Sequence, residues 1–245
     1  MDSTRTLARR AALFYWLQCL PCPFAYFYVP DRLLVPGDLL GTVDHVRVSE
    51  GLLRAAVVAE LFSATMTIFA LVAYDRLFRR TDEKMSMTMA AMMLASVPIS
   101  FVNSIFNIAP LVLTKSPALA SQLGPGAIAA LVTLFLRLHN YGLVVNQFFW
   151  ALWLFPLGIL IMRSQFIPRW LGYPLFAAGT GYVASSLGTL LLPPELRWMT
   201  GWTLALGAGE FPALFYMLIW GARSTSATAS PGADAFAVGA AGGSA

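Results

Sequence analysis

The sequence predicts an all-α, polytopic membrane helical bundle of about six transmembrane helices, with one short interfacial or re-entrant helix. Composition is the basis for this fold class: 58% of the 245 residues are hydrophobic, only 11% are charged, and the mean hydropathy is +0.69. A water-soluble domain is typically about a quarter charged. Because one span needs about 20 apolar residues, the chain has room for roughly five to seven crossings.

Apolar segments separated by charged or Pro/Gly-rich loops mark the expected helices. Proline removes a helix hydrogen bond, so Pro21 and Pro23 are expected to kink the first span. Glu50 and Arg54, four residues apart, are expected to pair at the start of the second. The loop before them is predicted to hold a short interfacial helix over residues 39–49. The six predicted spans cover residues 7–29, 50–74, 85–113, 141–162, 171–192 and 199–220.

Residues 126–138 are apolar but too few to cross a bilayer alone. We therefore expect them to form the short interfacial or re-entrant helix, which breaks at the polar run His139–Gly142 before the fourth span begins.

The distribution of basic residues predicts the orientation. Ten of the 16 Lys and Arg residues fall on the side of the N-terminus in this topology. Basic loops favour the cytoplasmic side, so both termini are expected in the cytoplasm of a cell with the protein in its inner membrane. Residues 1–223 are expected to form a single transmembrane domain, and the low-complexity tail 224–245 to be disordered.

Polar side chains within the apolar segments are the candidate functional residues. Such groups are costly in hydrocarbon and normally face protein or a wet cavity. Glu60, Glu210 and His139 are the candidate catalytic residues, because a desolvated carboxyl favours its protonated form and histidine exchanges protons near neutral pH. They cluster toward the outer half of the predicted bilayer with the candidate ligand-binding residues Arg54, Asn103, Asn107, Arg137, Asn140, Tyr141, Asn146, Gln147 and Trp150.

A structural role is the alternative for each of these residues taken singly. Glu60 could pair with Arg54 or Arg137, and the asparagines could bond one helix to another. For the cluster as a whole, two carboxyls in so small a membrane protein favour a functional pocket over simple packing.

Other classes of protein are disfavoured by the sequence. Cys19 and Cys22 form a single C-x-x-C in an apolar segment, which favours core packing over redox or metal chemistry. No Walker loop, HExxH or GxSxG motif is present, so no cofactor and no metal are predicted. No soluble basic face exists for nucleic acid, and the expected partners are membrane lipid and a small amphiphilic or isoprenoid ligand.

Several long runs resemble an uncharacterised bacterial multi-pass membrane family, of the domain of unknown function 4386 type. The resemblance covers nearly the whole chain up to Arg223, and it implies a helical fold of about six spans without an established activity. Two departures are the acid Glu60, where such proteins often carry Asp, and the CPCP run near Cys19. The matching runs are YVPDRLLVPGD (28–38), SEGLLRAAVVAEL (49–61), VPISFVN (97–103), LHNYGLVVNQFFWALWLFPLGILIMRSQFIPRWLG (138–172), GTGYVASS (179–186) and GAGEFPALFYMLIWG (207–221).

Two functions fit these residues. The first, slightly favoured because intramembrane acids are commoner in binding and proton pathways, is a non-catalytic protein that binds, moves or senses a small amphiphile. The second is an intramembrane enzyme on a lipid or isoprenoid substrate. In that hypothesis Glu60 and Glu210 act as acids, similar in plan to membrane-bound terpenoid cyclases, and Trp150 and its aromatic neighbours attract a carbocation.

Overall fold

The computed structural model describes residues 3–223, and this part of the chain is helical nearly throughout. Short π or 3-10 segments lie at Pro23–Tyr28, Arg169–Leu171, Pro194–Leu196 and Leu206–Glu210. The α-helices are α1 (Thr4–Cys19), α2 (Val29–Leu33), α3 (Leu39–Val48), α4 (Glu50–Phe78), α5 (Glu83–Lys115), α6 (Pro117–Leu152), α7 (Leu154–Arg163), α8 (Gly172–Leu191), α9 (Trp198–Ala205) and α10 (Phe211–Ile219).

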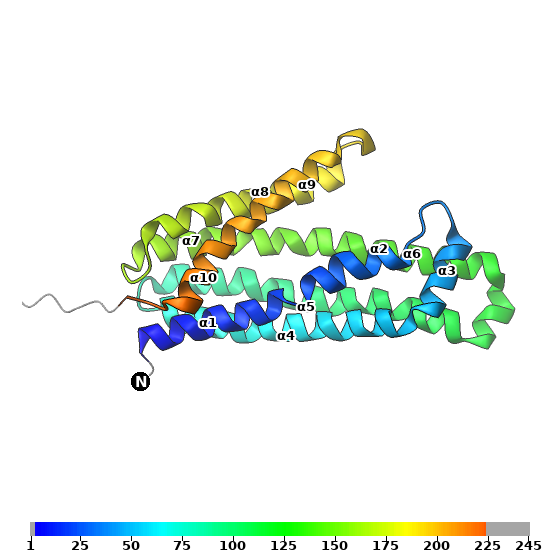
Figure 1. The fold of residues 1–245 in the computed structure, drawn as a ribbon, viewed down its shortest axis with the longest axis horizontal. Coiled ribbons are helices and arrows are strands. Elements are labelled where there is room, and N and C mark those ends of the chain that lie inside the picture. The colour runs from blue at the N-terminus through cyan, green and yellow to red at the C-terminus, as the bar shows by residue number, and fades with distance from the viewer. Residues whose placement is uncertain (1–2, 224–245) are drawn as a thin grey trace, which may run out of the picture.

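These helices form an elongated bundle along whose long axis the described chain runs back and forth (Figure 1). The successive passes are α1 with α2, then α4, α5, α6 with α7, α8, and finally α9 with α10. Both ends of the described chain lie at one end of the bundle, where Nη2 of Arg9 donates to the backbone oxygen of Ile219 at 2.6 Å. The predicted helical membrane bundle is confirmed.

Four helical stretches in the described residues are long and apolar enough to cross a membrane. They are Glu50–Phe78, Glu83–Lys115, Pro117–Arg163 and Pro194–Ile219. The first pass and α8 lie alongside them, but each is shorter or less apolar. The predicted tail 224–245 lies outside the described residues.

Capping side chains explain where several helices begin. Asp38 accepts from the N–H of Gly41 at 2.8 Å at the start of α3, and Asp82 accepts from that of Met85 at 3.0 Å at the start of α5. The Met85 N–H, together with Arg163, holds the pKa of the Asp82 carboxyl below its usual value. The predicted pair of Glu50 with Arg54 is confirmed, with 2.6 Å between Oε1 and Nε.

The predicted break at His139–Gly142 is wrong, because α6 continues through these residues to Leu152. The chain departs from helical geometry at Gly124 instead, where φ is 73° and ψ is 167°. Glycine adopts positive φ without a steric penalty, and Pro125 has no N–H to continue the preceding turn. Residues 126–138 are therefore the first part of a long helix rather than a separate short one.

Irregular segments interrupt the first and last passes. α1 ends at Cys19, and the chain continues as a π-helical segment from Pro23 to Tyr28, which confirms the predicted kink. The predicted last span is divided by the 3-10 segment Leu206–Glu210 just before Pro212. Glu210 is therefore placed at a break between two helices, where its side chain can point inward.

Two hydrophobic clusters fill the bundle. One, near the chain ends, gathers residues such as Tyr74, Leu157 and Met217, and the other, near α3, gathers residues such as Leu53 and Val132. The α4, α5 and α6 residues between the two clusters are unusually polar. We call this region the polar layer; its buried members are Glu60, Ser63, Thr67, Ser96, Asn103, Ser104, Asn107, His139 and Asn146.

Candidate functional site

Glu60 lies at the centre of a sealed cluster in the polar layer. Oγ of Ser104 donates to Oε2 of Glu60 at 2.8 Å, and Nδ2 of Asn107 donates to Oε1 at 2.9 Å. Nε2 of His139 is also 2.9 Å from Oε1, at ion-pair distance although not aligned for a hydrogen bond. The exposed fractions of Glu60 and His139 are only 3% and 1%, so the contacts of this carboxyl are with protein.

The same cluster fixes the approach of α5 to α6. Nδ2 of Asn103 donates to the backbone oxygen of His139 at 3.1 Å. Gly142, one turn further on, leaves the space that the Asn103 amide occupies, since a Cβ there would lie 1.8 Å from Oδ1 of Asn103. Nδ2 of Asn146 donates to Oγ of Ser100 at 2.7 Å in the next turn. These bonds join α4, α5 and α6 into one unit.

Glu210 belongs to a second cluster, formed by a different set of helices. Oη of Tyr15, on α1, donates to Oε2 at 2.5 Å, and Oη of Tyr182, on α8, donates to Oε1 at 2.9 Å. Gly207 allows the approach of Tyr182, because a Cβ at position 207 would lie 2.4 Å from the tyrosine ring. The Glu210 carboxyl is 5% exposed, and the partners that donate to it in the described residues are neutral phenols.

Glu210 and both tyrosines line a cavity of about 470 Å³, a volume within the range of small-molecule pockets. Its wall on α6 extends from Asn140 to Trp150, about 15 Å at 1.5 Å per residue. Aromatic rings pack along this wall: Tyr26 stacks on Trp150 at 5.8 Å, and Tyr15 lies 5.2 Å from Trp153 between ring centroids. The polar lining residues include Gln18, Ser63, Thr67, Ser96, Ser100, Asn140, Gln147, Ser185, Thr189 and Thr200.

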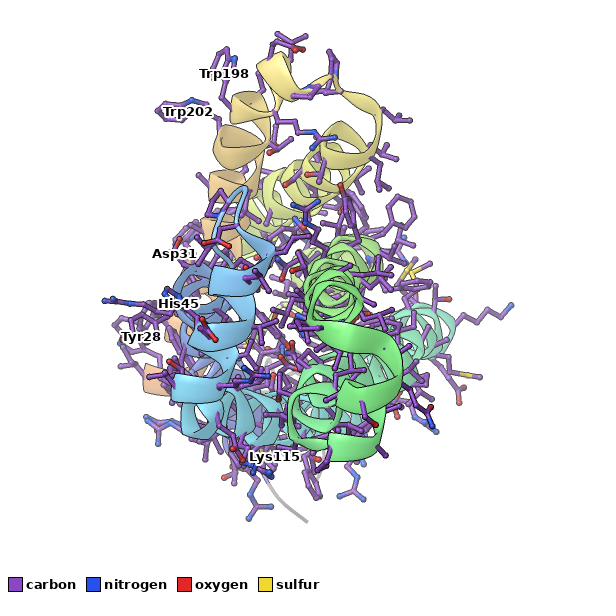
Figure 2. The ribbon with its side chains drawn as sticks, turned by 90° about the vertical axis from the view of Figure 1, so that its right-hand side faces the viewer. Tyr28, Asp31, His45, Lys115, Trp198 and Trp202 are labelled. Carbon is purple, nitrogen blue, oxygen red and sulfur yellow. The ribbon has the colours of Figure 1, made fainter. Side chains whose placement is uncertain are left out.

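The rim of the cavity is contributed by exposed residues of two elements. Phe27 comes from the π-helical segment and Gly201 from α9, and both are exposed. α8 and α9 diverge from α2 on this side (Figure 1). Beside the rim, Trp198 and Trp202 project away from the bundle (Figure 2), as is typical of side chains at a membrane–water interface.

The predicted site residues fall into three groups. Glu210, Asn140, Gln147 and Trp150 line the cavity. Glu60, His139, Asn103, Asn107 and Asn146 form or adjoin the sealed cluster and are absent from the lining found among the described residues. Arg54, Arg137 and Tyr141 are exposed on the surface.

The partner predicted for Glu60 was wrong. Neither Arg54 nor Arg137 contacts this carboxyl; Arg54 pairs with Glu50, and His139 occupies the place expected for an arginine. A long, charged side chain lowers its free energy by extending toward water, whereas the shorter imidazole can remain buried beside Glu60.

Sequence reasoning missed Tyr15, Tyr182 and Gln18 as lining residues. Tyrosine in an apolar segment is usually interpreted as interfacial or packing, and no pattern joins positions 15, 182 and 210. Cys19 and Cys22 also line the cavity, as free thiols. The described residues contain no group of three or more His, Cys, Asp or Glu side chains arranged to hold a metal ion.

Apolar helices long enough to cross a membrane, packed around a cavity, define a multi-pass membrane protein. Within that class, the family model for "Domain of unknown function (DUF4386)" matches residues 11–221, so the chain belongs to this family. It is also similar to an uncharacterised protein of Archaeoglobus fulgidus, with 30% identity over 91 residues. That match covers 36% of this chain and 51%, about half, of the relative. No solved structure matches the chain.

Proposed function

We propose that the protein binds a small amphiphile in the cavity beside Glu210. The observation that carries this proposal is a buried carboxyl on the cavity wall that is hydrogen-bonded only by neutral phenols among the described residues. Each oxygen of the carboxyl accepts one of these bonds and keeps a second acceptor position. A ligand that enters the cavity can donate a hydrogen bond to that position.

The polar groups of the wall indicate the chemistry of the ligand head. A carboxylate has about four acceptor positions, and the phenols of Tyr15 and Tyr182 use two of those on Glu210. Nε2 of Gln147 is a buried donor without a partner in the described residues. A hydroxyl or amine head can donate to Glu210, and the oxygen of a hydroxyl can accept from Gln147. Aromatic rings around the cavity further favour a cationic amine.

The rim explains how such a ligand would enter. Phe27 and Gly201 are exposed on helices that pack within an apolar bundle, so the opening faces the lipid rather than bulk water. The positive-inside rule places the basic end of the bundle, which carries both chain ends, on the cytoplasmic side of the inner membrane. The rim and the polar layer are then in the outer half of the bilayer.

A binding function is better supported than the intramembrane enzyme on an isoprenoid. That mechanism needs Glu60 and Glu210 beside one substrate. Only Glu210 lines the cavity, while Glu60 is bonded to Ser104 and Asn107.

Native mass spectrometry with three probes of equal chain length tests the proposal. Decylamine, decanol and decanoate differ only in the head group. We expect adducts of decylamine and decanol with the folded protein and little decanoate, because a second carboxylate would lie against Glu210. Glu210→Gln should reduce decylamine occupancy at least tenfold and leave the fold intact.

A pair of glycine variants controls for non-specific uptake of these probes. Gly201 and Gly126 are both helical glycines at which an added Cβ would meet no atom of the described residues within 4 Å, but only Gly201 is at the rim. Gly201→Leu should reduce occupancy by every bound probe, and Gly126→Leu should not. Equal binding of all three probes by the wild type and Gly201→Leu would contradict the proposal.

A further inference from the structure

The turn between α4 and α5 carries a basic groove that the proposed cavity does not include. Its wall contains three arginines and one acid, Arg76, Arg79, Arg80 and Asp75, with the apolar residues Leu71, Val72, Met87 and Ala90. Val72 and Arg76 are four residues apart on α4 and share one face of it, and Arg79 and Arg80 follow in the turn after the helix ends at Phe78. The groove therefore has a basic half at the end of the two helices and an apolar half that continues along them.

The positive charge of this groove is only partly neutralised. Arg79 is held by Asp75, at 2.5 Å from Nη2 to Oδ2, and Asp75 also accepts from Ser86. Arg76 and Arg80 are exposed, and their side chains take part in none of the hydrogen bonds or ion pairs of the described residues. Asp82, the next acid along the turn, is engaged with Arg163 on α7.

The apolar half of the groove distinguishes a lipid from a soluble anion. Val72 and Met87 are exposed, and both belong to stretches apolar enough to cross a membrane. Arg76 lies in the last turn of the first stretch and Arg79 and Arg80 follow its end, where the head groups of a bilayer are expected. Basic pockets between membrane helices are typical sites for anionic lipid head groups.

We infer that the groove of Arg76, Arg79 and Arg80 between α4 and α5 binds an anionic phospholipid, with the phosphate on the arginines and an acyl chain along Val72 and Met87. Asp75 orients Arg79, while Arg76 and Arg80 supply the unneutralised charge. This site is independent of the amphiphile cavity.

Native mass spectrometry of the full chain with phosphatidylglycerol and phosphatidylcholine of identical acyl chains tests this inference. The wild type should retain phosphatidylglycerol in preference to phosphatidylcholine. One basic side chain near an anionic lipid contributes about fivefold in affinity. Arg76→Gln/Arg80→Gln should therefore reduce phosphatidylglycerol affinity by roughly ten- to thirtyfold.

The matched control is Arg32→Gln/Arg47→Gln, which removes two exposed arginines near the opposite end of the bundle and should keep the preference. Size-exclusion elution at the wild-type volume establishes that each variant is folded. Equal phosphatidylglycerol retention by the wild type and the Arg76/Arg80 variant would overturn the inference. Displacement of the lipid by an equal concentration of free glycerol 3-phosphate would overturn its assignment to a lipid rather than a soluble phosphate.

Discussion

Glu60 and Glu210 are both buried carboxyls held by side chains from neighbouring helices, and they differ in what their remaining hydrogen-bonding capacity faces. The Glu60 carboxyl is surrounded by protein side chains, those of Ser104, Asn107 and His139. The Glu210 carboxyl is bonded by Tyr15 and Tyr182 on one side and faces the cavity on the other. The two acids are therefore equally buried, and only Glu210 has a side that faces a cavity, which is the reason for proposing a binding site there.

Replacing each acid by leucine should give the largest difference between the two clusters. Glu60→Leu leaves His139 and the Asn107 amide with unpaired polar groups in a sealed space, whereas the Ser104 hydroxyl keeps the backbone oxygen of Ser100 as its acceptor. Breaking a buried pair in this way costs about 3–5 kcal/mol. Reversible unfolding in mixed detergent micelles measures the change in the free energy of unfolding.

The same substitution at position 210 is the matched comparison. Tyr15 and Tyr182 would lose their acceptor, but water in the cavity can replace it, so we expect a cost of about 1–2 kcal/mol. A loss of stability at Glu210→Leu as large as at Glu60→Leu would remove the distinction between a sealed and an open cluster.

Gly142→Ala tests how tightly the sealed cluster is packed. The new methyl would overlap Oδ1 of Asn103 and force its amide away from the His139 backbone oxygen. Overpacking of this kind costs about 1–3 kcal/mol. Gly126→Ala on the same helix meets no atom within 4 Å and should stabilise by up to about 1 kcal/mol. If the two substitutions change the midpoint temperature of thermal unfolding by the same amount, the close contact at Gly142 does not constrain the packing.

Asn146 and Gln147 are adjacent on α6, and replacing each of them is expected to give the smallest difference in stability. Asn146→Leu removes the bond to Ser100 and should cost about 1 kcal/mol. Gln147→Leu removes a buried amide nitrogen that has no partner among residues 3–223, so the stability of this variant should stay within about 0.5 kcal/mol of the wild type.

Ligand occupancy should respond in the opposite order. Decanol adducts in native mass spectrometry should fall severalfold in Gln147→Leu and remain near wild type in Asn146→Leu. Unchanged occupancy in Gln147→Leu would show that this amide does not contact the head group.

The fold could be predicted to the extent that it depends on composition along the chain. Apolar runs and their charged boundaries located α4, α5 and α8 to within a few residues. The break in α6 was placed wrongly because His139 and Asn140 look like a loop in sequence, whereas in the bundle Asn103 reaches the backbone there from α5. A polar run therefore need not end a helix when a neighbouring helix supplies hydrogen-bond partners, as Asn103 does for the His139 backbone oxygen.

The candidate site could be predicted only in part, for a related reason. The sequence identifies Glu60, His139 and Glu210 as costly residues, but it does not indicate which of them face each other. The pairing of Glu60 with His139 depends on how α5 packs against both α4 and α6 and so brings the two side chains together. Tyr15 and Tyr182 become recognisable as partners of Glu210 only once α1 and α8 lie beside the last pass.

The contacts between the first and last passes also have a consequence for biosynthesis. Tyr15 is separated from Glu210 by 195 residues, and Arg9 from Ile219 by 210. The ribosome makes α1 long before the segment that supplies these partners. Until Glu210 has been made, the Tyr15 hydroxyl must therefore bond to some other group. A nascent chain that ends before Glu210 has no complete cavity, so the proposed ligand could bind only after the last helix has been inserted.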